Sequence, residues 1–408
     1  MTIMTKTYPI WETPTRGKAQ MMYAQMRQED PVHRAIGPVS KNPFWFLTRY
    51  DDVSNFLKDP RFGKEIHKSL PAELANRYFP PQDPDDIFAV VNYHLLNMDA
   101  PSHTRLRSLV HKAFTPRMVE NLRPRIAEIA GHFLDGMDNQ TVREGDLIQM
   151  YAFPIPVIVI AEMLGVPSTD REKFREWTRN LLFGNDQETG MISAMEFTSY
   201  LNMLIDERKS HPQDDLLTNL IQAEEAGDKM SHMELTSMIF LLLVAGHETT
   251  VNLIANGTLA FLRHPDQLDK LRQNPALIRN AIEEILRYEG PVETTTTRWA
   301  FEDVTIGGVT IPKGEAVLGA LLGANRDPAM FHNPNVFDIE RENASKHIGF
   351  GAGIHYCLGA PLARLEGTIA LDLLLKRFTT LELAVAVDEL EWNPTILLHG
   401  MSAMPVKW

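Results

Sequence analysis

Residues 350–359, with the sequence FGAGIHYCLG, contain the only cysteine of the 408-residue chain, Cys357, directly before a helical pattern of apolar residues. A lone intracellular cysteine is most often a small buried hydrophobic residue, and the next interpretation is a catalytic nucleophile. A nucleophile elbow needs glycine where this chain has His355, and a phosphate-binding loop needs one where it has Tyr356. Zinc would need several Cys or His ligands at short spacing, so one cysteine is too few.

The remaining interpretation is a thiolate ligand to a haem iron. Gly351 and Gly353 let the backbone approach a flat porphyrin closely. Cys357 stands at the start of the predicted helix, where backbone N–H groups and the helix dipole lower a thiol's pKa. Phe350 would shield the sulfur, and His355 would donate to a haem propionate. A thiolate ligand of this kind favours O–O bond cleavage.

The stretch resembles the haem-binding signature of the cytochrome P450 superfamily, Phe-Gly-x-Gly-x-His-x-Cys-x-Gly, and matches it at every fixed position. The resemblance, to the soluble bacterial type, covers essentially the whole chain. It implies one mainly α domain over residues 1–408 with a small β region, a long central helix over the haem and the cysteine loop beneath it. It also implies a haem b cofactor, with Cys357 as the metal ligand and further contacts from Phe350, Gly351, His355 and Gly359.

Composition excludes several other classes. There are 53 Asp and Glu against 40 Lys and Arg, a net charge of −13, which argues against a nucleic-acid partner. A single cysteine permits no internal disulfide and suits a reducing, cytoplasmic compartment. The N-terminal residues 1–13 lack an apolar run, so we expect neither a signal peptide nor a membrane anchor. We find no flavin or nicotinamide fingerprint, so electrons would come from another protein.

A long helix is predicted over residues 232–264. Ser231 and Glu234 fit a capping box at its start, and Pro265 ends it. Its middle, residues 239–244, is apolar on all sides, which indicates burial.

The polar sequence Ala245-Gly246-His247-Glu248-Thr249-Thr250 follows this apolar stretch. An acid in a buried helix is costly unless it has a partner or a task. Thr249 can bond back to the Ala245 carbonyl and loosen the helix, which predicts a kink. A helix-packing glycine beside polar residues satisfied elsewhere explains the residues equally well. The family motif Ala-Gly-x-Glu/Asp-Thr instead implies that Glu248 and Thr249 relay protons to the oxygen and that Ala245 and Gly246 lie against the haem.

His103 and Arg107 are four residues apart on a predicted helix and share one face. Such a pair is usually only solvated. The resemblance implies that both bind haem propionates, as Arg298 would.

Arg105 and Lys112 project from roughly the opposite side of this helix. Residues 103–125 hold six lysines and arginines and one acid, in an otherwise acidic chain. Such a patch would steer an acidic redox protein. The resemblance implies docking here of a ferredoxin or flavodoxin, itself served by a reductase.

Glu284 and Arg287 form a Glu-x-x-Arg pair, which alone is common on helices. The resemblance implies that they join Arg341 in a buried structural network beside the cysteine loop.

Candidate substrate contacts come from the Pro-rich stretch at residues 61–98, the lid helices, the long helix and the C-terminal part of the chain. Packing into the core explains most of them at least as well. They are Phe88, Val90, Val91, Leu182, Leu243, Val244, Val292, Thr294 and Met401. The apolar candidates indicate a hydrophobic small molecule, and fatty acids, terpenoids, steroids and macrolides all fit.

The sequence therefore predicts a monooxygenase that inserts one oxygen atom from O2. Alternatives are a peroxygenase or another haem-thiolate reaction, and a non-catalytic haem sensor. The acid–alcohol pair Glu248 and Thr249 argues against both the peroxygenase and the sensor. A cysteine hydrolase is a further alternative, and it would be colourless.

Overall fold

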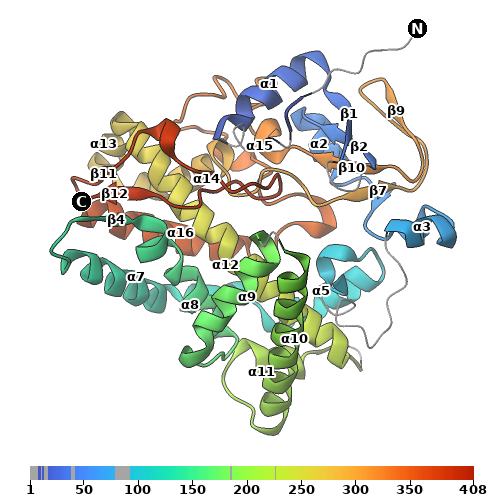
Figure 1. The fold of residues 1–408 in the computed structure, drawn as a ribbon, viewed down its shortest axis with the longest axis horizontal. Coiled ribbons are helices and arrows are strands. Elements are labelled where there is room, and N and C mark those ends of the chain that lie inside the picture. The colour runs from blue at the N-terminus through green and yellow to red at the C-terminus, as the bar shows by residue number, and fades with distance from the viewer. Residues whose placement is uncertain are drawn as a thin grey trace.

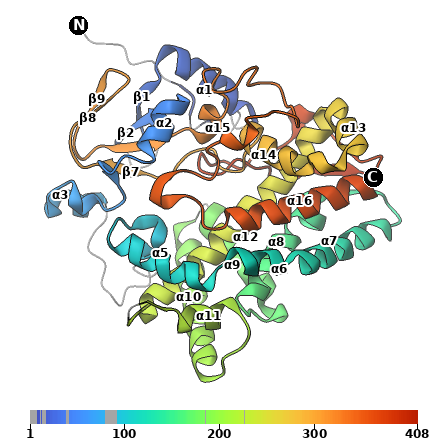
Figure 2. The ribbon, with the colours of Figure 1, turned by 180° about the vertical axis from the view of Figure 1, so that it is seen from behind.

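The computed structural model describes residues 8–10, 12, 17–37, 42–78, 92–183, 186–225 and 227–408. The protein is mostly helical with a small β region, as predicted (Figures 1 and 2). The helices are α1 (Ala19–Glu29), α2 (Tyr50–Phe56), α3 (Ala72–Tyr78), α5 (Ser102–Ala113), α6 (Pro116–Asn121), α7 (Arg123–Asp138), α8 (Pro154–Met163), α9 (Arg171–Phe183), α10 (Gln187–Ser210), α11 (Leu216–Gln222), α12 (His232–Arg263), α13 (Pro265–Gln273), α14 (Ile278–Tyr288), α15 (Leu321–Ala324) and α16 (Ala360–Arg377). The strands are β1 (Val32–Ile36), β2 (Pro43–Leu47), β3 (Phe62–Gly63), β4 (Glu144–Asp146), β5 (Glu224–Glu225), β6 (Asp228–Lys229), β7 (Arg298–Ala300), β8 (Val304–Ile306), β9 (Val309–Ile311), β10 (Ala316–Gly319), β11 (Glu382–Leu383) and β12 (Pro405–Lys407).

The largest sheet joins three N-terminal strands with β7 and β10, in the order β1-β2-β10-β7-β3. β1 and β2 form an antiparallel hairpin, and β2 pairs in parallel with β10, with Phe44 opposite Ala316. β7 then pairs antiparallel with both β10 and β3. Because β7 begins at Arg298, this sheet fixes the position of one predicted site residue.

The predicted long helix is confirmed as α12, with 32 residues, or about 48 Å at ~1.5 Å per residue. The capping box is also present: the Ser231 hydroxyl accepts from the Glu234 N–H, and the Glu234 carboxylate accepts from the Ser231 N–H. Within the described ranges, α12 is the one helix long and apolar enough to cross a membrane, with a window hydropathy of 1.6. However, 61% of that window is buried in the molecule, as in a core helix.

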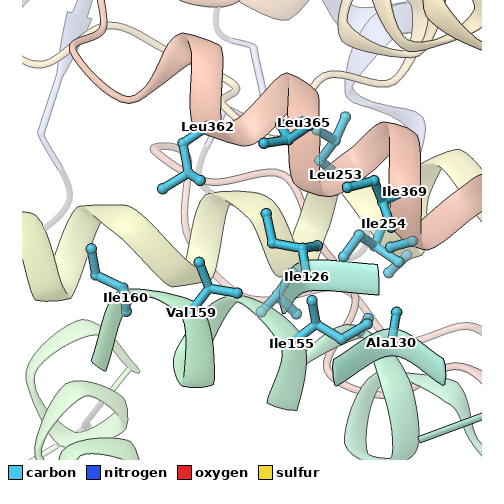
Figure 3. Close-up of a cluster of buried hydrophobic side chains, with 14 of the residues drawn as sticks. Ile126, Ala130, Ile155, Val159, Ile160, Leu253, Ile254, Leu362, Leu365 and Ile369 are labelled. Carbon is cyan, nitrogen blue, oxygen red and sulfur yellow. The ribbon is translucent and has the colours of Figure 1, made fainter. Parts of the chain in front are cut away.

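The core lies where α12 packs on α8 and α16, and where α7 packs on α16 and α8 (Figure 3). Side chains of the four helices meet there: Ile126, Ala130, Ile155, Val159, Ile160, Leu253, Ile254, Leu362, Leu365 and Ile369. Burying large aliphatic groups of this kind contributes about 1.5–3 kcal/mol each. This packing holds α12 and the start of α16 in fixed positions, and the cysteine loop directly precedes α16.

Candidate active site

A cavity of about 320 Å³ lies between the cysteine loop and α12. It brings together residues that are far apart in the sequence. Its lining includes the predicted cofactor contacts His103, Arg107, Ala245, Gly246, Arg298, Phe350, Gly351, His355, Cys357 and Gly359, together with Thr249.

The cysteine loop has a backbone shape that depends on glycine. Gly351 and Gly353 both have φ of 72°, in the left-handed region. A Cβ at residue 353 would lie 2.6 Å from the Leu57 carbonyl oxygen, so this turn also requires the close approach of two backbones. The Cys357 N–H donates to the Phe350 carbonyl at 2.9 Å and closes the loop.

Two arginines support the loop from its flanks. Arg107 donates to the carbonyl oxygens of Ile354 at 2.9 Å and Tyr356 at 2.6 Å. The Arg364 guanidinium lies 4.5 Å from the centre of the Phe350 ring and pairs with Glu283. Arg107 was predicted as a propionate ligand; it lines the cavity and also holds the cysteine loop.

The environment of the free Cys357 thiol differs from the expectation. Burial raises its pKa, although the N–H groups of Gly359 and Ala360 and the charge of Arg107 oppose the shift. The N–H groups at the helix start act in the predicted direction, but desolvation outweighs them, so the pKa of the free thiol is raised. A bound metal ion reverses this balance, since a coordinating thiol is deprotonated outright.

One edge of the cavity is rich in basic side chains. The rings of His103 and His355 lie 4.4 Å apart, and burial, followed by the charge of Arg298, lowers the His355 pKa to about 2. His103 is 1% exposed, and neither ring nitrogen has a hydrogen-bond partner among the described residues. Arg298 is buried and donates to the Leu57 carbonyl at 2.9 Å.

Lys64 belongs to the same edge and escaped the sequence analysis. It lines the cavity, and its Nζ bonds to Thr296 Oγ1 and, at 2.9 Å, to the Thr297 carbonyl. Burial, followed by repulsion from Arg298, lowers its pKa to about 7. The His103 ring nitrogens lack partners among the described residues, and the cations Lys64 and Arg298 repel each other. A ligand with two carboxylates would satisfy both, and the two propionates of haem fit this requirement.

The polar segment of α12 faces the cavity only in part. Thr249 lines it, and its Oγ1 donates to the Ala245 carbonyl at 3.0 Å, as predicted. α12 is continuous here, so the predicted kink is not a break in the helix. The Glu248 side chain lies outside the cavity lining with 13% exposure, and burial raises its pKa to about 7.

Glu366 on α16 is a second acid in the cavity wall that was missed. It is 1% exposed, accepts from Thr250 of α12, and its Oε2 has no partner among the described residues. Burial raises its pKa to about 8. The available signal was an acid directly after Leu365, among the buried apolar residues Leu362, Leu365 and Ile369 of this helix.

The candidate substrate contacts divide into three groups. Val292 and Thr294 line the cavity. Leu243, Val244 and Met401 do not, and Leu241, Leu242 and Leu397 line it instead. Phe88, Val90 and Val91 lie outside the described residues, as does the side chain of Leu182.

The Glu-x-x-Arg pair and Arg341 meet in the interior. The Arg287 Nε and Nη2 donate to Glu284 at 2.7 Å each, and the Arg341 Nε lies 3.1 Å from the same carboxylate. Arg287 also donates to the Asn325 carbonyl, and the Asn325 Oδ1 accepts from the Ile348 N–H just before the cysteine loop. This network therefore anchors the approach to residues 350–359.

The expected docking patch is revised by the structure. Arg105 pairs with Asp228, at 3.0 Å, and with Glu234 at the start of α12. Acids distant in the sequence neutralise its charge, so Arg105 does not offer the free cation that the local charge count predicted. Lys112 borders a shallow pocket with Asn219 and Gln222.

Comparison with known proteins agrees with this geometry. The family model described as Cytochrome P450 matches residues 175–402. The polyketide biosynthesis cytochrome P450 PksS of Bacillus subtilis (strain 168) is 45% identical over 389 residues, covering 94% of each chain. The cytochrome P450 monooxygenase PikC of Streptomyces venezuelae is 44% identical over 388 residues, 95% of this chain and 90% of PikC.

The same similarity extends to solved structures. A myxobacterial cytochrome P450, CYP267B1, in complex with myristic acid superposes with a TM-score of 0.91 and 44% identity, covering 98% of this chain and 99% of that one. The sequence, the fold and the cavity therefore agree, and this chain belongs to the cytochrome P450 family of haem-iron oxidoreductases.

Proposed function

We propose that this protein is a haem b monooxygenase that inserts one atom of O2 into a hydrophobic small molecule. The observation that carries the proposal is the shared cavity: Cys357 and Thr249 line it from different elements, the cysteine loop and α12. When bound, a thiolate-ligated haem activates O2 with two electrons, transfers one oxygen atom to the substrate and releases the other as water.

The residues of this chain divide the remaining work. Cys357 would ligate the iron. The propionates would take the edge formed by the cations Arg298 and Lys64 and the imidazoles of His103 and His355, with Arg107 holding the loop. The Thr249 hydroxyl donates to the Ala245 carbonyl, which leaves its lone pairs free to accept from a water molecule.

Glu248 would supply protons to this water. Its pKa near 7 means that the acid and carboxylate forms coexist at neutral pH, the condition under which a group both gives and regains a proton efficiently. We assign Glu248 and Thr249 the proton-delivery role on this basis.

The substrate is inferred from the lining of the cavity. Leu241, Leu242, Val292 and Leu397 offer aliphatic surface, with hydroxyls from Thr294 and its neighbours. This lining favours an apolar molecule with few polar groups. The myristic acid bound by CYP267B1 and the polyketide pathway named for PksS support a fatty-acyl or polyketide substrate.

The electron donor would be a ferredoxin or flavodoxin with its reductase, in the cytoplasm. We place its docking surface around Ile354 and Tyr356, which are 49% and 40% exposed beside Cys357. Lys58 and Arg107 add positive charge near this surface. The Lys58 backbone lies beside Gly353, because a Cβ at residue 353 would be 3.3 Å from the Lys58 Cα, and Arg107 bonds to the Ile354 carbonyl. We prefer this surface to the patch around Arg105 and Lys112, because Arg105 is paired with Asp228 and Glu234.

The first test is spectroscopic and isotopic. The reduced protein with CO is expected to give the strongly red-shifted Soret band of thiolate-ligated haem, and Cys357→Ala to lose it. Turnover under ¹⁸O2 is expected to place one labelled atom in the product. If the oxygen atom in the product comes from hydrogen peroxide, and turnover needs neither O2 nor an electron donor, the result would favour the peroxygenase. If the protein binds O2 without consuming it, the result would favour the sensor.

The proton role has its own test. Thr249→Ala is expected to retain haem and substrate binding but to divert electrons into hydrogen peroxide, whereas Thr249→Ser keeps the hydroxyl and the coupling. Full coupling in Thr249→Ala would reject the assignment.

A further inference from the structure

His247 follows the apolar residues 239–244 of α12 and directly precedes Glu248. α12 packs on α8 in this part of the molecule. It is 5% exposed, and its Nδ1 lies 2.7 Å from the Leu243 carbonyl oxygen. A carbonyl only accepts, so Nδ1 carries the proton and Nε2 presents a lone pair. Glu248 Oε2 lies 4.0 Å from this Nε2. A small side-chain rotation, or one bridging water, would let a protonated Glu248 donate to the imidazole.

The surroundings of His247 are apolar. A void of about 10 Å³ beside the ring is lined by Val157, Ile160, Ala161, Phe174, Thr178 and Leu243. The Phe153 ring lies edge-on at 6.1 Å. None of these side chains is titratable in the accessible pH range.

The charged groups described on the neighbouring helices are exposed or have partners elsewhere, and Glu176 and Arg179 of α9 are exposed. Glu162 of α8 pairs with Arg125 at 2.8 Å, and Glu196 of α10 accepts from Trp177 Nε1 at 2.9 Å. Burial is the cause of the raised Glu248 pKa, and burial also lowers the pKa of His247. Two desolvated neutral groups are thus favoured over an imidazolium–carboxylate pair, which would bury two charges.

We propose that His247 is a positioning residue whose Nε2 accepts a hydrogen bond from the protonated Glu248 carboxyl, and so holds a transferable proton one residue from Thr249. The proposal rests on the proposed function, because it assigns a use to that proton. In the step, the Glu248 O–H bond breaks, its proton passes to the water held by Thr249, and that water would give up one of its own protons to the oxygen that is reduced to water. The Glu248 carboxylate then regains a proton from solvent water, while His247 stays neutral.

The test measures the protonation of Glu248 directly, without turnover. The infrared band of its protonated carboxyl is followed against pH in the haem-loaded ferric enzyme and assigned by its loss in Glu248→Gln but not in Glu366→Gln. His247→Phe removes the acceptor and is expected to lower the midpoint of this band by about one pH unit, because the protonated form loses a hydrogen bond. His247→Gln retains an N–H for Leu243 and an oxygen for Glu248, and is expected to restore the midpoint.

The chain supplies a matched control. His264 makes the same bond to the carbonyl four residues earlier, that of Ala260, at 2.8 Å, but packs against Tyr288 and Phe337. His264→Phe is expected to leave the Glu248 midpoint unchanged. If His247→Phe does not take up haem, His247→Met gives the same measurement with a more adaptable side chain.

The second readout is the pH dependence of coupled turnover. Coupling is expected to fall as pH rises through the midpoint in the parent enzyme, and at correspondingly lower pH in His247→Phe. An unchanged infrared midpoint in His247→Phe overturns the inference about His247 alone. Full coupling in Glu248→Gln would instead overturn the proton role of Glu248 in the proposed function, and the two failures are distinguishable because the infrared midpoint needs no turnover.

Discussion

Arg107 of α5 donates a hydrogen bond of 2.6 Å to the carbonyl oxygen of Tyr356, the residue before Cys357. A second bond reaches Ile354. The residue predicted to hold the cofactor from one side therefore also holds the backbone of the loop that carries the thiol.

Removing Arg107 should loosen this loop. Arg107→Ala deletes two charge-assisted bonds, each worth about 1.5–3 kcal/mol when buried and less at this partly exposed site. We expect haem to dissociate several-fold faster and the CO complex to shift partly to the spectrum of a protonated thiol. Transfer of haem to apomyoglobin measures the rate. Arg117→Ala, an exposed arginine on α6, is the control, and equal rates in the two variants would contradict the role.

Lys64 should have opposite effects on the apoprotein and on cofactor binding. Its pKa is lowered to about 7 in the folded protein, below the unfolded value of about 10.4. Between these two pH values the unfolded chain binds the extra proton, so the stability of the apoprotein should rise with pH from about 7 to about 10.4. Lys64→Met removes this cost and should stabilise the apoprotein at pH 7. The same variant should lose haem faster, because a propionate loses a cation, whereas Lys64→Arg should bind it well.

Chemical denaturation of the apoprotein and haem transfer from the holoprotein measure the two effects of Lys64. Lys68→Met is the matched control, since the Lys68 ammonium pairs with Glu65 on the surface. If the Lys64→Met apoprotein is less stable than the parent and loses haem at an unchanged rate, the assignment of Lys64 is rejected.

Glu366 should make stability depend on pH with the opposite sign. Burial raises its pKa to about 8, above the unfolded value of about 4.3, so the stability associated with the neutral acid is fully present below pH ~4 and lost as pH rises through 8. Glu366→Gln stays neutral and can still accept from Thr250. We expect it to match the parent at pH 4 and to be more stable at pH 8.5, measured by urea unfolding. A constant difference between the two pH values would show that Glu366 is not the titrating group.

Gly353 has a left-handed backbone conformation and also lies close to the Leu57 carbonyl oxygen. The cost of replacing glycine can be measured separately for these two features. Gly353→Ala should destabilise the protein by more than the ~1–2 kcal/mol of the backbone conformation alone, because its Cβ would lie 2.6 Å from the Leu57 carbonyl oxygen. Gly308, with φ of 82° and no atom within 4 Å of a Cβ, isolates the conformational part. We expect Gly308→Ala to bind haem normally and Gly353→Ala to bind it weakly. Equal thermal shifts would mean that the contact relaxes without cost.

The sequence predicted features whose chemistry is local. The cysteine loop was identified because glycines, His355 and Cys357 stand at fixed spacing. α12 was identified because a capping box and Pro265 mark its ends. The Thr249 bond to Ala245 follows from helix geometry alone.

Features that depend on tertiary packing could not be predicted in the same way. The face of α12 that points into the cavity could not be predicted, because residues 239–244 are apolar on all sides of the helix. The sequence therefore did not distinguish Leu241 and Leu242, which line the cavity, from Leu243 and Val244, which do not. Lys64 has no motif around it, and its importance appears only when β3 and β7 pair. Arg105 seemed free because its acidic partners lie more than a hundred residues further along the chain.

The parallel pairing of β2 with β10 has a consequence for the order of events during synthesis. Phe44 pairs with Ala316, and Leu57 contacts both Arg298 and the turn at Gly353. This side of the cavity is thus assembled from residues 44–57 and residues 298–353, and contacts this distant in sequence form late. Cys357 and the α16 side of the core lie still further along the chain, so the cavity can close only when most of the polypeptide has been synthesised, and we expect the prosthetic group to be acquired late.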